Sequence, residues 1–136
     1  MIAQYEVTLP PFARGFHLIT DLFLEKLQDL PQHGLLHIFI KHTSAGISIS
    51  ENSDPSVRVD LENIFRVLVP ENEPYYTHDT EGPDDMPAHM KNILVGCSVT
   101  IPISDHALNL GTWQGIYLCE FRNQAESRDL VVTIYS

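Results

Sequence analysis

Seven histidines are the residues of this chain whose type best suits chemistry at a metal site. Neutral imidazoles from three separate elements are a common way to build a catalytic zinc site with one open position. His42 follows an apolar segment, His78 stands in a long acidic segment, and His89 lies on the inward face of a short predicted helix. Spacing alone favours ordinary core or surface histidines, because no HxxxH or HxH pair fixes two ligands on one element.

Carboxylates crowd the same part of the chain, at positions 79–85. Most of this segment is interpreted as a solvated loop with a helix start, and Glu81 fits that interpretation. Glu51 differs, because it follows an alternating strand on the parity of Ile47 and Ile49. A carboxylate there is either tied to backbone donors or held in a site as a base.

Hydroxyl side chains stand beside His42, at Thr43 and Ser44. Because no GxSxG elbow surrounds them, the serine-hydrolase interpretation is weak. Farther along, the turn 111–115 carries two glycines that permit a close approach to a ligand, together with Trp113 and Gln114. Trp113 is either a core plug or a stacking surface for a substrate.

Arginine is the side chain best suited to bind an anionic group in this chain. Arg122 follows a predicted strand, where it either balances the acidic surface or binds an oxyanion through two hydrogen bonds. With 8 Lys and Arg against 18 Asp and Glu, the net charge is −10. Such a charge disfavours binding to nucleic acid or to an anionic membrane surface, but it permits local binding of a small anion.

The cysteines and the N-terminus bear on the cellular setting. Cys97 and Cys119 are too far apart for a CxxC motif, and each lies in an apolar run, so we expect two reduced core thiols in a cytoplasmic protein. The N-terminal residues have neither a basic region nor an apolar core, so no signal peptide is expected. No segment is long and apolar enough to cross a bilayer.

The elements that must position these side chains form a single domain, residues 1–136, by length and by the absence of linkers and repeats. Asp54 and Pro55 mark the best helix start, since Asp caps a helix and Pro fits its first position. A second helix starts at Asp84 and Asp85, and a third follows Ile19. Strands are predicted at 4–9, 35–41, 47–50, 98–103, 116–121 and 130–135. This order predicts an α+β fold with a largely antiparallel sheet or sandwich core and two or three helices.

Three sequence blocks together resemble the signature of the YjbQ-like family, also called the secondary thiamine-phosphate synthase family. They are HTSAGISISENSDPSVRVDLE from His42, YYTHDTEGPDDMPAHMK from Tyr75 and LGTWQGIYLCEFR from Leu110. The resemblance covers residues 16–135 and implies a small α+β fold, a cytoplasmic setting and a homotrimer with sites near subunit boundaries. Asp105-His106-Ala107 departs from it, because the family is expected to have an Asn/Asp-Gly-basic turn there.

The resemblance also implies a set of site residues. His42, His78 and His89 match recurring histidines, the expected ligands of a divalent metal, with zinc favoured and magnesium possible. Other recurring polar positions are matched by Glu51, Asp60, Asp85, Gln114 and Arg122. From these we predict catalytic roles for Glu51, Asp85 and Arg122, and substrate contacts for Thr43, Ser44, Trp113, Gln114 and Arg122. The sequence assigns no role to Asp60 or Asp84.

Three functions remain open at this stage. The resemblance implies weak thiamine-phosphate synthesis, in which a thiazole phosphate joins a pyrimidine pyrophosphate and pyrophosphate leaves. The second hypothesis is a zinc-dependent hydrolase of a phosphorylated or heterocyclic metabolite. The third is a trimer that binds an anionic metabolite without catalysis.

Overall fold

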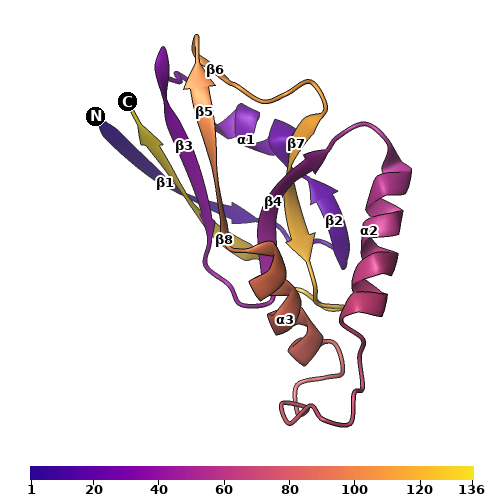
Figure 1. Cartoon of the computed structure of the whole chain (residues 1–136). Helices are drawn as coiled ribbons and strands as arrows, with labels where there is room; N and C mark the ends of the chain where they lie inside the picture. The colour runs from indigo at the N-terminus through magenta and orange to yellow at the C-terminus, as the bar shows by residue number, and fades with distance from the viewer.

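Two antiparallel sheets and a pair of helices form three layers (Figure 1). The structure is a computed structural model that describes residues 1–136. Its elements in chain order are β1 (Ile2–Leu9), β2 (Gly15–Leu18), α1 (Thr20–Lys26), β3 (His33–Ile40), β4 (Ala45–Glu51), α2 (Pro55–Leu68), α3 (Asp85–Val95), β5 (Ser98–Ser104), β6 (Ala107–Leu108), β7 (Gln114–Glu120) and β8 (Arg128–Tyr135).

The main core lies between the two sheets. One sheet has the strand order β1-β8-β3-β5-β6 and the other has the order β2-β7-β4, with every neighbouring pair antiparallel. Alternation along β3 places Leu36, Ile38 and Ile40 inward, against Ile47 of β4 and Leu118 of β7. This core of 18 buried residues holds the two sheets together. The predicted α+β class with an antiparallel sandwich core is confirmed.

Helices α2 and α3 cover the other face of the three-stranded sheet (Figure 1). The central strand β7 is therefore buried on both faces: Ile116 and Leu118 face the main core, while Tyr117 and Cys119 face the helices. Asp54 caps α2 as predicted, since its side chain accepts a hydrogen bond from the Ser56 N–H at 2.9 Å. The site described below lies at the end of this sheet where β7 ends.

Several local expectations differ from the structure. The strands β2 and β6 are not predicted, because four and two residues are too few to show an alternating pattern. The core-thiol prediction holds for Cys119 but is wrong for Cys97, which lies exposed just after α3. The apolar side chains of α2 are only partly covered, since Ile64 and Leu68 remain exposed.

The turn that departs from the family pattern has a definite backbone conformation. Asp105 and His106 both have positive φ, 54° and 64°, a conformation that Asn and Gly adopt more easily. The His106 ring compensates in part, because its Nδ1 donates to the Leu30 carbonyl at 2.9 Å. None of the helices is long and apolar enough to span a membrane.

Candidate functional site

Asp85 lies at the start of α3 and brings two imidazoles together. Its side chain is 2% exposed, and its Oδ2 lies 2.6 Å from Nε2 of His78 and 3.0 Å from Nε2 of His89. The ligand atoms of the three residues all lie within 4.8 Å of one another. Two imidazole nitrogens and a carboxylate oxygen in this arrangement form a donor set that suits a divalent cation such as zinc.

His89 is held on both sides of its ring. It stands four residues after Asp85 on the same face of α3, and its Nδ1 lies 2.8 Å from the Thr43 carbonyl oxygen. A carbonyl only accepts hydrogen bonds, so Nδ1 carries a proton and donates it. Nε2 then faces the Asp85 carboxylate, which is also an acceptor. The lone pair of Nε2 and the carboxylate repel each other unless a cation lies between them. That cation is either a proton on Nε2 or a bound metal ion.

Arg122, two residues after the end of β7, binds the acidic residues at the start of α3. Its Nε donates to Asp84 Oδ2 at 2.9 Å, its Nη1 donates to Asp85 Oδ1, and its Nη2 donates to the Glu81 carbonyl at 3.0 Å. All three arms of the guanidinium are therefore used within the chain. This arrangement fixes the orientation of the Asp85 carboxylate relative to both imidazoles.

The two buried carboxyl groups are held in their charged form. Burial by itself raises the pKa of Asp85, but the hydrogen bond from His78 and the charges of His89 and Arg122 outweigh it, so the pKa lies below its ordinary value. Burial likewise opposes ionisation of Asp84, but the Asn123 backbone N–H and Arg122 lower its pKa. Both carboxylates are thus ionised at neutral pH.

Helix α3 is attached closely to the turn between β3 and β4. Asn92, three residues after His89, donates to the Ala45 carbonyl at 2.7 Å. Next to it, Gly46 permits the close approach of the helix end, because a Cβ there would lie 2.9 Å from Val95 Cγ1 and 3.0 Å from the Gly96 carbonyl oxygen. These contacts fix the position of α3 relative to β4, and so they place the His89 ring against the Thr43 carbonyl.

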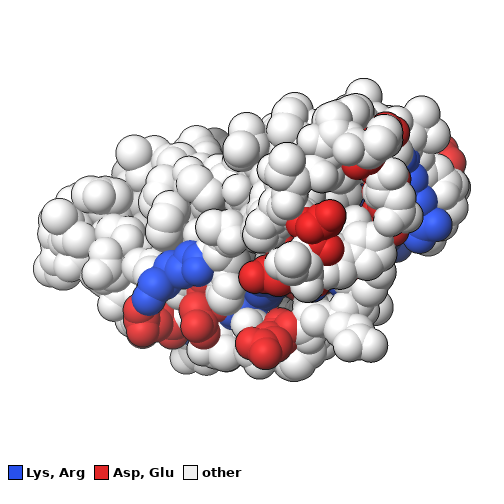
Figure 2. Space-filling view, turned by 90° about the horizontal axis from the view of Figure 1, so that it is seen from below, with Lys and Arg blue, Asp and Glu red and all other residues white.

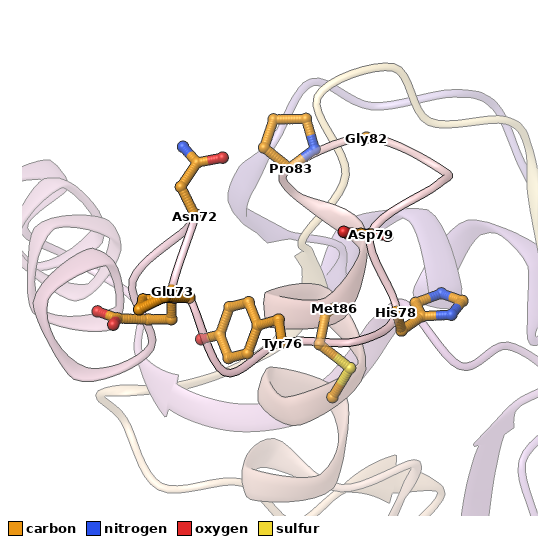
Figure 3. A pocket seen from close by; sticks show the side chains of 9 residues that line it. Asn72, Glu73, Tyr76, His78, Asp79, Gly82, Pro83 and Met86 are labelled. Atoms are coloured by element: carbon orange, nitrogen blue, oxygen red, sulfur yellow. The ribbon is translucent and has the colours of Figure 1, made fainter.

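A cavity of about 370 Å³ opens beside His78 (Figure 3). The loop between α2 and α3 and the start of α3 form its walls, with His78 at one side and Glu73 at the other. Tyr76 is fixed in this loop by a 2.7 Å hydrogen bond from its hydroxyl to the Pro70 carbonyl. The lining is mostly polar and includes Asp79, so the cavity suits a small polar molecule rather than an apolar one.

Comparison with known proteins places the chain in a family. The family model described as UPF0047 protein YjbQ-like matches residues 5–136. The chain is 47% identical to the UPF0047 protein YjbQ of Salmonella typhimurium over 133 residues, 96% of each chain. This chain belongs to the YjbQ/UPF0047 family. The predicted resemblance to the YjbQ-like family is confirmed, whereas the link to thiamine-phosphate synthesis stays a prediction.

Solved structures of related proteins share the fold. A conserved hypothetical protein of Thermus thermophilus matches with a TM-score of 0.82 at 30% identity, covering 94% of this chain and 97% of that chain. A YjbQ/UPF0047 protein of Clostridium acetobutylicum matches with a TM-score of 0.81 at 34% identity, covering 96% and 99%. The architecture of this YjbQ-family chain is therefore that of solved relatives.

The third predicted histidine of this YjbQ-family chain, His42, lies outside the group formed with Asp85. Its Nε2 accepts a hydrogen bond from the Asp129 N–H at 2.8 Å. Burial and the nearby Arg128 lower its pKa, which keeps the ring neutral. His42 is still close in sequence to the site, since the next residue, Thr43, binds His89. Metal ligation by His42 stays a prediction.

Three other predicted site residues, Glu51, Trp113 and Gln114, lie at the opposite end of the three-stranded sheet. Glu51 pairs with Gln114 at that end of the β4–β7 ladder, whereas Ala45 pairs with Glu120 at the end near Asp85. Both carboxylate oxygens of Glu51 accept backbone N–H bonds, from Ser53 and Asp54. Of the two alternatives for Glu51, this arrangement corresponds to the carboxylate tied to backbone donors.

The turn before β7 is stabilised by the side chain of Gln114. Gln114 Oε1 accepts from the Gly111 N–H at 2.8 Å, and the neighbouring Trp113 is 66% exposed, so it is not a core plug. The structure does not bring Trp113 or Gln114 to the Asp85 group within one chain. Their predicted substrate contacts, like the catalytic role of Glu51, stay predictions.

Sequence reasoning missed an ion pair beneath the site. Glu120 is fully buried between the sheets, and its carboxylate is bound by Arg128 through Nε at 2.8 Å and Nη2 at 2.6 Å. No local signal marks this pair, because the two residues join separate strands across the β7–β8 loop. The contact between Asp85 and His89 was detectable, since an i,i+4 spacing on a helix places both side chains on one face.

Proposed function

We propose that this chain is a metal-dependent enzyme acting on a small phosphorylated metabolite, with a divalent ion held by His78, Asp85 and His89. The observation that carries the proposal is the position of His89, whose two ring nitrogens both face acceptors. A metal ion bound by Nε2 and the carboxylate satisfies both, and Nδ1 donating to a carbonyl is the usual support of a metal-binding histidine.

Zinc is the proposed ion. Two nitrogen donors with one carboxylate oxygen match catalytic zinc sites that keep an open position, whereas magnesium prefers oxygen donors alone. A bound zinc ion supplies a Lewis acid that polarises a phosphoryl or carbonyl oxygen or lowers the pKa of water. Within the chain, Arg122 orients Asp85 and the Thr43 carbonyl fixes the His89 ring.

Metal binding is tested by titrating zinc into chelator-treated protein and by measuring the metal content of protein purified without added metal. We expect one tight site in the wild type and at least a tenfold loss of affinity in His89→Ala and Asp85→Asn. His33→Ala is the matched control, since His33 is exposed at the start of β3. Stoichiometric metal in a His42→Ala/His78→Ala/His89→Ala variant would refute the proposed site.

The first reaction to test is weak thiamine-phosphate synthesis. Joining a thiazole phosphate to a pyrimidine pyrophosphate requires charge neutralisation on the leaving pyrophosphate and alignment of two heterocycles. Zinc-loaded protein is incubated with both substrates, and thiamine phosphate and pyrophosphate are measured, with Asp85→Asn as the control. No product above this control would exclude the reaction.

The second candidate is a hydrolase, and the cavity beside His78 is the observation that favours it. Glu73 and Asp79 line this cavity and are carboxylates able to take a proton from water. Release of inorganic phosphate from phosphate esters would identify this activity, whereas the synthase forms a condensation product. Binding of phosphorylated ligands without turnover in metal-saturated protein would instead identify a non-catalytic binder.

A cytoplasmic homotrimer completes the proposal. The outer face of the five-stranded sheet supports an assembly, since Ile2, Leu35, Phe39 and Tyr135 are all more than 40% exposed there. Neighbouring apolar side chains on an uncovered sheet are typical of an interface. Size-exclusion chromatography with light scattering at micromolar concentration is expected to give a trimer mass; a monomer mass would exclude the assembly.

A further inference from the structure

A second cavity, of about 250 Å³, lies close to the Asp85 group. Arg122, which binds Asp85, forms part of its wall. Its walls come from the turn between β3 and β4, the end of β7 and the loop between β7 and β8. Its lining includes the side chains of His42, Ser44, Arg122, Gln124, Glu126 and Arg128. Figure 2 shows this underside of the molecule, where small areas of Lys and Arg lie between larger areas of Asp and Glu.

His42 presents a hydrogen-bond donor at this cavity. Its Nε2 accepts from the Asp129 N–H, so the ring proton is on Nδ1. Nδ1 makes no hydrogen bond within the chain. The Asp129 N–H in β8 therefore fixes the tautomer of His42 and leaves the Nδ1–H free to donate to a ligand.

Arg128 presents another unused donor. Its Nε and Nη2 hold the buried Glu120, and Nη2 also donates to the Ser44 carbonyl at 3.3 Å, but Nη1 has no partner in the chain. The side chain is 7% exposed, so its position is fixed by this ion pair rather than by solvent. A guanidinium held in this way keeps its remaining N–H groups pre-oriented for an anion.

The loop and turn add further donors without partners. The hydroxyl of Ser44 and the side-chain amide of Gln124 make no hydrogen bond within the chain. None of the backbone N–H groups of residues 124–127 donates within the chain either. Against these donors stands one carboxylate in the lining, that of Glu126. The lining therefore offers several donors without partners and a single carboxylate, while its hydroxyls and side-chain amide can both donate and accept.

We propose that this cavity binds the phosphoryl group of the substrate, through His42 Nδ1, Arg128 Nη1, Ser44 and Gln124. The inference rests on the proposed function for the phosphorylated class of metabolite. A phosphoryl group offers three acceptor oxygens to converging donors, which fits the donors without partners, and the cavity is small enough to favour it over a larger ligand.

The same chain segments position the cavity and the Asp85 group. Arg122 lines the cavity and binds Asp85, while Thr43 lies between His42 and Ser44 and its carbonyl holds His89. A phosphoryl group bound in the cavity thus places the rest of a metabolite beside the imidazoles. In this arrangement His42 serves the anion, and the metal is left to His78, Asp85 and His89.

The test is calorimetric titration of inorganic phosphate into the chelator-treated full chain, so that no metal ion contributes to binding. We expect Gln124→Glu to weaken phosphate binding by at least tenfold, because it adds a charge that repels the anion. Ser44→Ala removes one donor and should weaken binding by about three- to tenfold. Glu126→Gln removes the one carboxylate of the lining and should strengthen it.

Gln32→Glu is the matched control, since it adds the same charge at an exposed position outside the cavity and should leave phosphate binding unchanged. Thermal unfolding of each variant checks that the fold is retained. Equal phosphate affinity in Gln124→Glu and the wild type overturns the proposal. Acetate binding as tight as phosphate binding also overturns it, because it would identify a carboxylate site.

The same variants separate this inference from the proposed function. Gln124→Glu should retain zinc binding, and His78→Ala, whose side chain lines the other cavity, should lose zinc but retain phosphate. Absence of a zinc site together with the expected phosphate pattern would refute the metal site alone. A zinc site with no effect of the cavity variants on phosphate would refute the phosphoryl site alone.

Discussion

The two ends of the three-stranded sheet carry similar residue types in very different surroundings. At one end, Asp85 is buried and binds His78, His89 and Arg122, all from other parts of the chain or the next helical turn. At the other end, the Glu51 carboxylate binds only backbone N–H groups two and three residues away. Long-range, buried contacts constrain side-chain positions, whereas local contacts mainly shape a turn. The comparison favours Asp85 over Glu51 as the carboxylate of the proposed site.

Removing the central carboxylate should have the largest effect. Asp85→Ala leaves Arg122 and two imidazoles without their shared acceptor, so we expect the free energy of unfolding to fall by about 3–5 kcal/mol. At the other end, Glu51→Ala removes backbone hydrogen bonds in an exposed turn and should cost about 1 kcal/mol. Urea unfolding of the metal-free proteins measures both. Equal losses would contradict the distinction between the two ends.

Replacing the guanidinium of Arg122 by an ammonium group should have the next largest effect. Arg122→Lys keeps the charge but cannot bind Asp84, Asp85 and the Glu81 carbonyl together. Because Asp85 then loses its fixed orientation, we expect zinc affinity to fall by about tenfold. Zinc titration with a competing chelator measures this. Unchanged zinc affinity in a folded variant would show that the guanidinium only stabilises the fold.

The pH dependence of stability should also differ between the ends. The pKa values of Asp84 and Asp85 are below the ordinary 3.8, so their contribution is fully present above pH 3.8 and is lost as pH falls through the folded-state values. The pKa of Asp54 is lowered too, by its bonds to Ser56, but this carboxylate is fully exposed. Acid unfolding should therefore shift less in Asp54→Asn than in Asp84→Asn. The reverse order would contradict the burial argument.

The smallest effect is expected at Trp113. Its exposed ring contributes little to packing in one chain, so Trp113→Ala should change the free energy of unfolding by less than about 0.5 kcal/mol. Urea unfolding at low protein concentration measures this. A larger loss that grows with protein concentration would place Trp113 in a subunit interface, and would bring that end of the sheet into an assembled site.

The sequence predicted most of the fold because its signals are local. Alternation identified the long strands, and Asp54-Pro55 marked the start of α2 at the correct residue. Two elements of the site also had local signals, namely the start of α3 and the face carrying His89. The Glu120–Arg128 pair and the bond between His89 and Thr43 had none, because each depends on the packing of separate segments. Family resemblance marks recurring residues but does not tell which end of the sheet each one occupies.

The separation of the two hydrophobic clusters has a consequence for hydrogen exchange. The core between the sheets contains no residue of α2 or α3, and both helices rest on a second cluster of five buried residues. Such a layer can open as a unit while the sheets stay closed, so its amides exchange through a lower-energy opening than those of β3 or β8. A ligand that joins α3 to the end of β7 would suppress that opening. Its footprint would be slow exchange along α3, with the amides of the five-stranded sheet unchanged.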